Sequence, residues 1–208
     1  FTNYENGTIV EFDPNTISGA NGGNETYKTI YSGVFGTSND FWDTDLLAAG
    51  QSWTSMGSSE NYIFITHESY APYNQHRIIK IRISDGDYSV IDSPIPPDNI
   101  EVLDDDRFYI TNYNRYPHDT DDLEGRAPGK ILYYDGSKFT YLGSGDKGIK
   151  DGDIKVAEFN IPNHITLDKG NNLVFMDVDP SSNTPAHPNK LMIRKINLGS
   201  FNIPASNL

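Results

Sequence analysis

A repeated pattern of short strand-like segments constrains this 208-residue chain more than any other feature of its sequence. Each unit contains an inner strand, a short turn, a middle strand, a long polar connection, a third strand, a tight turn and an outer strand. Three copies have a clear middle and third strand: YIFIT with RIIKIRI, RFYITNY with KILYYD, and LVFMDV with KLMIRKI. Short apolar or alternating runs bounded by Gly, Asn and Asp are typical of antiparallel strands. We therefore expect an all-β fold.

A partial fourth copy opens the chain, because GTIVEFD near the N-terminus matches GKILYYD in the second complete copy. The third strands begin at Thr8, Arg77, Lys130 and Lys190, which are 69, 53 and 60 residues apart. Such spacings suit the four-stranded blades of a β-propeller, lengthened by insertions. Four blades is at the small end of the usual range of about four to eight, so we expect these units to be part of a larger propeller. The expected single domain has blade units at about 1–35, 51–91, 99–142 and 160–208.

One stretch of the chain resembles a known repeat. Residues 142–196 contain, in order, a Gly-rich loop, an Asp-Gly pair, Phe-Asn-Ile-Pro, the turn DKGNN, a strand that ends in Asp, and the strand Ile-Arg-Lys-Ile. This order of landmarks resembles the NHL repeat. Residues 51–91 and 99–142 keep the strand rhythm but lack the loop signature. The fold that the resemblance implies is a β-propeller, in agreement with the repeat spacing.

The Gly-rich loop also contains a literal G-x-G-x-x-G at Gly143, Gly145 and Gly148. In a dinucleotide-binding site the third glycine opens a helix, whose N-terminal N–H groups hold the phosphates. Here Gly152 and Pro162 leave room for little more than one helical turn. We therefore reject nucleotide binding at this loop.

The NHL resemblance implies that the loop joins the outer strand of one blade to the inner strand of the next. We expect turn conformations at Gly143, Gly145 and Gly152, a tight site at Ala157, and the fixed start of a strand at Pro162. A second interpretation is a Ca²⁺ site, because carboxylates in a Gly-rich loop are suitable oxygen ligands. Its ligands would be Asp146, Asp151 and Asp153. The spacing of these aspartates does not match an EF-hand.

Charge and composition exclude several classes of function. The formal net charge is −13 and the basic residues are scattered, which argues against nucleic acid as a partner. The absence of cysteine excludes disulfides and thiolate chemistry. No apolar run approaches the roughly 18 residues of a membrane span. Asn6 and Asn24 begin N-glycosylation patterns, and we expect an extracellular, periplasmic or cell-surface protein.

The connections between strands differ in length according to their expected face. In a propeller, the tight turns DKGNN, DDD, SDG and DGS would share one face, and the long polar segments would share the other. All five histidines fall in or beside the long segments, which are also rich in tyrosine and carboxylates. Tyrosine offers a large flat contact area and a hydroxyl at small entropic cost, which suits protein or carbohydrate recognition. The candidate binding residues are Tyr70, Tyr73, Tyr113, Arg115, Tyr116 and His118.

Two alternatives remain open at this point. Some propellers are metal-dependent lactonases or lyases, and a metal or acid–base cluster could form from His67, Glu68, His118 and Asp119. No pair of these residues has the compact spacing of H-E-x-x-H. The other alternative is a purely architectural role in a larger assembly. Because fold alone does not decide function, we expect binding or scaffolding from the loop composition.

Overall fold

The computed structural model confirms the all-β prediction and contains only antiparallel sheets in the residues it describes. Those residues are 2–3, 8–12, 27–32, 52–68, 76–112, 129–179 and 190–198. They contain no helix. Within these segments, therefore, nothing has the length and apolar character of a membrane-crossing helix.

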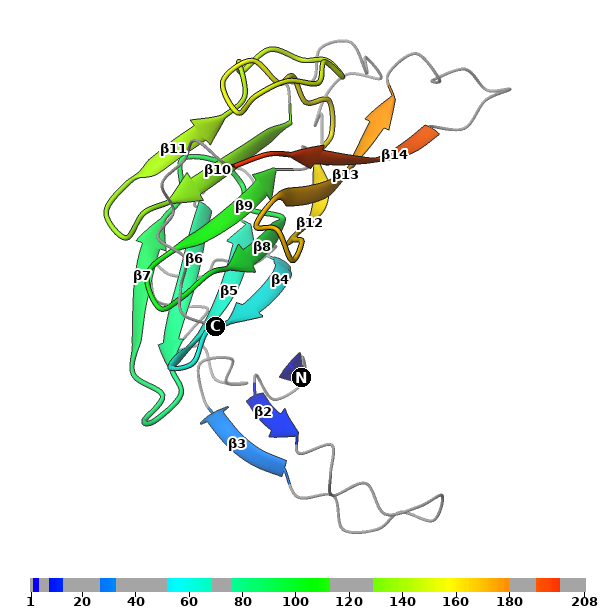
Figure 1. Cartoon of the computed structure of the whole chain (residues 1–208). Coiled ribbons are helices and arrows are strands. Elements are labelled where there is room, and N and C mark those ends of the chain that lie inside the picture. Colours follow the sequence, from blue (N-terminus) through cyan, green and yellow to red (C-terminus); the bar gives the residue numbers. More distant parts are fainter. Residues whose placement is uncertain are drawn as a thin grey trace, which may run out of the picture.

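Four sheets follow one another along the chain, and in each the strand order is the sequence order (Figure 1). The first contains β1 (Thr2–Asn3), β2 (Thr8–Phe12) and β3 (Tyr27–Ser32). The second contains β4 (Ser52–Ser58), β5 (Tyr62–Glu68), β6 (His76–Arg82) and β7 (Tyr88–Asp92). The third contains β8 (Asn99–Val102), β9 (Phe108–Asn112), β10 (Lys130–Tyr134) and β11 (Phe139–Leu142). The fourth contains β12 (Asn163–Leu167), β13 (Leu173–Asp179) and β14 (Lys190–Ile196).

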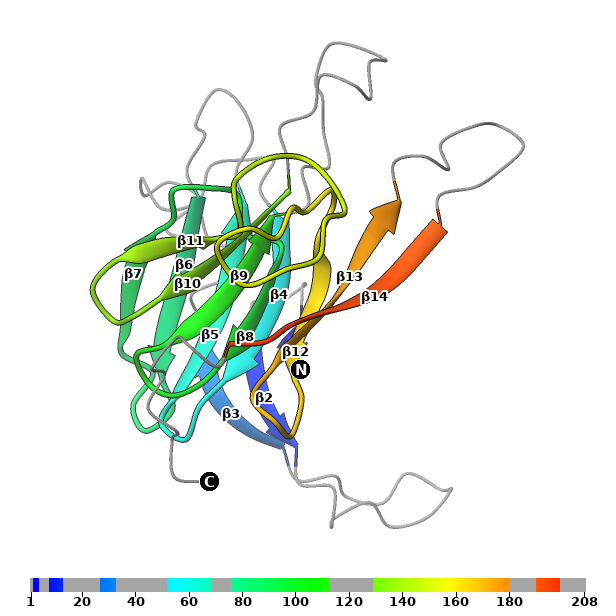
Figure 2. The same cartoon turned by 45° about the horizontal axis from the view of Figure 1, so that its top comes forward.

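The β8–β11 sheet lies between the β4–β7 sheet and the β12–β14 sheet (Figures 1 and 2). Its side chains enter both interfaces, since successive residues of a strand point to opposite faces. In β9 all five residues are buried. This explains why Phe108, Tyr109 and Ile110 are consecutive large side chains rather than alternating with polar ones.

One hydrophobic cluster fills each of these two interfaces. Phe64 and Ile78 pack with Phe108, Ile110 and Leu132 between the β4–β7 and β8–β11 sheets. The second cluster joins the β8–β11 sheet to the β12–β14 sheet and also includes three residues of the Gly-rich loop: Ile154, Ala157 and Phe159. Burial of one such aliphatic or aromatic side chain contributes about 1.5–3 kcal/mol.

The first strands of the last three sheets are neighbours and run in the same direction. At their starts, the Thr54 hydroxyl donates to the Pro97 carbonyl at 2.6 Å. At their ends, the Asn61 amide donates to the Asp105 carboxylate at 2.7 Å. β12 lies beside β8 in the same way, because the Leu167 N–H donates to the Glu101 carboxylate at 3.1 Å. The described residues show no closed ring of sheets, so the propeller remains a prediction.

Candidate functional site

The connections between strands sort onto two ends of the sheets. One end, here called the short-turn end, has the turns 59–61, 83–87, 103–107, 135–138 and 168–172. The other, the long-connection end, has the segments 69–75, 113–129, 143–162 and 180–189. Because β4, β8 and β12 run in the same direction, these four segments leave from the same end of the last three sheets. This distribution agrees with the expectation from the sequence.

The candidate binding residues fall in the sequence between strands that face the long-connection end. Tyr70 and Tyr73 lie in the connection between β5 and β6, and the other four lie in the connection between β9 and β10. All six candidate binding residues lie outside the described residues: Tyr70, Tyr73, Tyr113, Arg115, Tyr116 and His118. The glycosylation candidates Asn6 and Asn24 lie outside them as well. Their assignment as binding residues stays a prediction.

His67 is not an accessible loop residue. It lies within β5, and only 1% of its surface is exposed. Burial, together with the smaller effects of the nearby Arg77 and His76, lowers the pKa of His67 to about 4. The imidazole is therefore neutral at pH 7 and out of reach of a substrate in solvent. Of its proposed cluster partners, His118 and Asp119 lie outside the described residues.

The Gly-rich loop has a structural role in this fold. No helix follows Gly148 in residues 149–158, so the nucleotide-binding condition fails as expected. Gly143 has a φ of +87°, and a Cβ there would lie 2.6 Å from the Ala157 carbonyl oxygen. Pro162 is buried and directly precedes β12. Gly145 also has a φ of +87°, whereas the φ of Gly152 is not positive and an added Cβ there would meet the side chain of Val156.

A buried ion pair attaches this loop to the β12–β14 sheet. The Arg194 guanidinium contacts the Asp177 carboxylate at 2.7 Å, with 7% and 0% of the two side chains exposed. Arg194 also donates to the carbonyls of Glu158 at 2.7 Å and Lys150 at 2.8 Å. Asp177 in turn accepts a hydrogen bond from the Ile161 N–H at 2.7 Å. These two side chains thus hold both ends of the segment 150–161 against the sheet.

The proposed Ca²⁺ ligands are not brought together. The Asp151 carboxylate accepts a hydrogen bond from Arg194 at 2.9 Å, and the Asp153 carboxylate accepts one from the Lys155 N–H at 2.8 Å. Asp146 lies in the exposed part of the loop. Across the segments with described side chains, no three His, Asp or Glu residues form a group that could hold a metal ion. The three predicted ligands Asp146, Asp151 and Asp153 therefore do not form a cation site in this arrangement, in which a backbone N–H and Arg194 use oxygens of Asp153 and Asp151.

Sequence reasoning missed an irregularity at the start of β12. His164 is exposed and has a φ of +46°, which is uncommon for a residue other than glycine. The β12–β13 register shifts between Asn163 and Thr166, as in a β-bulge. The Asn99 amide on β8 donates to the Asn163 side chain directly beside it. Polar side chains thus mark the point where β8 and β12 begin at the long-connection end.

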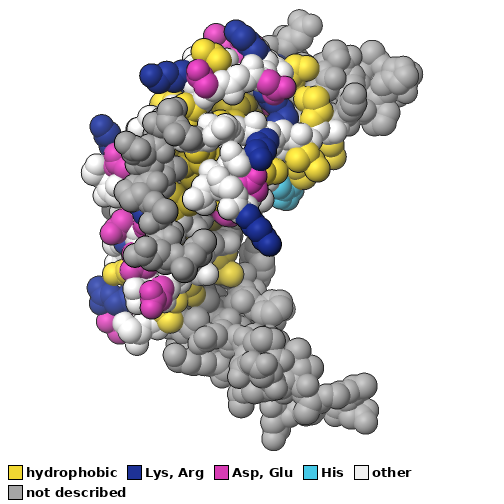
Figure 3. All heavy atoms as spheres, in the orientation of Figure 1, with side chains coloured by type: hydrophobic (Ala, Val, Ile, Leu, Met, Phe, Trp, Pro, Cys, Tyr) yellow, Lys and Arg dark blue, Asp and Glu magenta, His cyan; other side chains and the backbone are white. Residues whose placement is uncertain are grey.

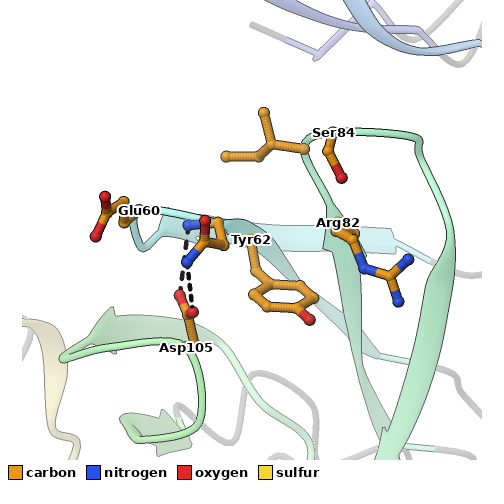
Figure 4. Close-up of a pocket in the computed structure, with 7 residues that line it drawn as sticks. Glu60, Tyr62, Arg82, Ser84 and Asp105 are labelled. Carbon is orange, nitrogen blue, oxygen red and sulfur yellow. Dashed lines mark hydrogen bonds between the residues drawn. The ribbon is translucent and has the colours of Figure 1, made fainter.

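A shallow pocket of about 330 Å³ lies at the opposite, short-turn end (Figure 4). The Tyr62 ring lies between the side chains of Asp105 and Arg82. The Asp105 oxygens accept hydrogen bonds from Asn61 and Ser59. The guanidinium of Arg82 is likewise occupied by two aspartates of its own turn. Asp105 thus joins two neighbouring turns, and Arg82 stabilises its own turn. Because both charged groups are already paired, the pocket gives no indication of a ligand.

No model of a known protein family matches the chain, and no curated protein matches it.

Proposed function

We propose that the chain is part of a β-propeller built from NHL-type repeats. The strongest support is the packing of the three sheets, whose first strands are parallel neighbours and whose faces are buried against each other. The NHL-like landmarks also have coherent roles in the fold. Arg194 and Asp177 bind each other, and Phe159 packs beside Phe175 with ring centroids 5.4 Å apart. A chance resemblance gives no reason for these residues to meet.

We propose further that the long-connection end binds a protein or a carbohydrate, and that the protein is a binding or scaffold module at the cell surface or outside the cell. One observation carries this proposal: the two tyrosine-rich connections, 69–75 and 113–129, leave from the same end of the packed sheets. Recognition residues are commonly carried on loops that a rigid scaffold positions. Aromatic rings with neighbouring carboxylates supply the flat contacts and hydrogen bonds that such partners need.

Tyrosine substitutions test this proposal. The double variants Tyr70→Ser/Tyr73→Ser and Tyr113→Ser/Tyr116→Ser would be compared with Tyr141→Ser, an exposed tyrosine of β11 that lies outside the long connections. Binding to an array of neutral and acidic oligosaccharides and to extracellular-matrix proteins would be measured. Loss of a recognition tyrosine is expected to weaken binding about tenfold or more, while the melting temperature changes little.

Two results would contradict the proposal. In one, Tyr141→Ser weakens binding as much as the loop variants do, so the long connections are not the site. In the other, the loop variants unfold at a much lower temperature and the protein binds none of the probes. That pattern would indicate that the tyrosines pack the connections against the sheets, and the architectural alternative would then be the better account.

A further inference from the structure

The three sheets with described side chains pack by one rule. The forward face of a sheet is defined here as the face toward the sheet that follows it, and the rear face as the opposite one. The forward face of the β4–β7 sheet, with Phe64 and Ile78, meets the rear face of the β8–β11 sheet. The forward face of the β8–β11 sheet, with Ile131 and Tyr133, meets the rear face of the β12–β14 sheet, with Phe175. Both occupied forward faces are thus covered by a β-sheet.

The forward face of the β12–β14 sheet breaks this rule. β14 aligns with β10 when Lys190 is matched to Lys130, so that Leu191 and Ile193 are equivalent to Ile131 and Tyr133. The two residues of β10 are 0% and 7% exposed. Their equivalents, Leu191 and Ile193, are 61% and 82% exposed. The same positions of the repeat are thus buried in one sheet and open to solvent in the next.

These two residues belong to a continuous apolar surface. Ile193 lies opposite Met176 in the strand register, and Leu191 lies opposite Val178. All four side chains therefore share the forward face, which appears as a group of hydrophobic side chains over β13 and β14 (Figure 3). The charged neighbour Lys195 is already paired with Asp168 at 2.7 Å. Covering this face therefore does not bury an unpaired charge.

A fourth strand of this sheet is not among the described residues. The β4–β7 and β8–β11 sheets each have a fourth strand, whereas β14 has no further partner strand among the described residues. An open strand edge beside an exposed apolar face is a place where other polypeptide packs. One kind of occupant accounts for both features, because a segment with several strands can pair with the edge of β14 and also cover the apolar face.

We propose that the surface of Met176, Val178, Leu191 and Ile193 binds the rear face of a further antiparallel β-sheet, supplied by the natural polypeptide as another repeat. The two rear faces seen here define the chemistry of that occupant: aromatic and branched aliphatic side chains such as Phe108, Ile110 and Phe175. A second copy of this chain cannot supply an equivalent surface from its β4–β7 sheet. The rear face of that sheet is already buried, as its residues show: Ile63, Ile65, Ile79 and Ile81.

Thiol footprinting tests the proposal, because the chain has no cysteine of its own. Ile193→Cys places a single thiol on the surface in question, and Lys169→Cys places one in an exposed turn of the same sheet as a matched control. Both variants would be made in the 208-residue chain and in the full natural polypeptide. The rate of maleimide modification would be followed by peptide-resolved mass spectrometry.

In the 208-residue chain we expect the two thiols to react at similar rates. In the natural polypeptide we expect Ile193→Cys to react at least about tenfold more slowly than Lys169→Cys, since thiol reactivity depends on access. Equal rates in the natural polypeptide would overturn the proposal. Protection that appears in the 208-residue chain with rising concentration, together with a doubled mass in light scattering, would also overturn it and identify a second copy as the occupant. The proposal rests on the repeat architecture proposed above. Neither result bears on ligand binding at the long-connection end, so the binding proposal fails independently of it.

Discussion

Replacement of Arg194 by methionine offers the most direct test of how the Gly-rich loop is held. Methionine retains most of the apolar stem but removes the charge and all the hydrogen-bond donors. The Asp177 carboxylate, with 0% of its side chain exposed, then loses its cation. The carbonyls of Lys150 and Glu158 lose a donor each. The segment 150–158 is thereby released from the sheet at several points in a single substitution.

The expected cost follows from the burial of the pair. Breaking a buried ion pair by removing one partner costs about 3–5 kcal/mol, because the remaining charge is left in a poorly solvated site. The free carbonyls can bind water once the loop moves, so they add little to this figure. For a chain of this length, about 3–5 kcal/mol corresponds to a fall in the melting temperature of roughly 6–20 °C. Such a loss is a large fraction of the stability of a typical domain.

The adjacent lysine provides a matched control on the same strand. Lys195 also forms an ion pair, with Asp168, but 56% of its side chain and 31% of that of Asp168 are exposed. Exposed pairs contribute about 0–1 kcal/mol, so Lys195→Met should change stability far less than Arg194→Met. Urea unfolding followed by tryptophan fluorescence and circular dichroism would measure both free energies. Hydrogen exchange at residues 150–158 should accelerate only in Arg194→Met.

The double variant Asp177→Asn/Arg194→Met then distinguishes a charge effect from loss of packing. If the buried charge causes the instability, removing it should recover part of the loss, and the two substitutions should be coupled by at least about 1 kcal/mol. The reasoning would be refuted if Arg194→Met cost no more than Lys195→Met. It would also be refuted if the effects of Asp177→Asn and Arg194→Met simply added.

Three further outcomes are expected. Gly145→Ala should lower the free energy of unfolding by about 1–2 kcal/mol, because φ is +87° there although no atom lies near the added Cβ. Gly143→Ala should lower it by at least about 1 kcal/mol more, because its Cβ would also meet the Ala157 carbonyl. Thermal unfolding of the two variants measures the difference. Folding lowers the pKa of His67 from 6.5 to about 4, so the contribution of neutral His67 to the free energy of unfolding is complete above pH 6.5. About 3 kcal/mol of that free energy is lost as the pH falls to 4. His67→Gln should therefore flatten the dependence of stability on pH, measured by urea unfolding. Asp135→Ala should accelerate amide exchange at Lys138, whose N–H it accepts at 2.9 Å, and Asp135→Asn should do so less.

The sequence predicted the strands well because their signal is local. Apolar runs bounded by turn residues fix where a strand begins and ends, and the repeated order of middle and third strands predicted the β5–β6, β9–β10 and β13–β14 hairpins. The burial of His67 was also visible in principle. It lies two and four residues after Ile65 and Ile63, so alternation places it on their buried face. His67 was expected in or beside a long connection, because polar residues follow it directly in the sequence.

Other features depend on contacts that no local pattern contains. The composition of the Gly-rich loop did not indicate which glycines have positive φ, so Gly143 and Gly152 looked alike. The aspartates of the loop were read as cation ligands because their partner, Arg194, is 43 residues away from Asp151 in the sequence. The uncovered state of Ile193 likewise could not be predicted, since its strand resembles β10, where the equivalent residue is buried.

The acidic short-turn end shows why charge alone is a poor guide to function in this protein. Asp104, Asp135 and Asp168 each begin a turn, and one oxygen of each accepts two backbone N–H hydrogen bonds at 2.8–3.0 Å from residues two to four positions ahead. Aspartate is favoured at such positions because its short side chain reaches the backbone of its own turn. These three aspartates therefore serve to close hairpins. Their charge has a structural explanation, so an acidic surface alone does not indicate a binding site at this end.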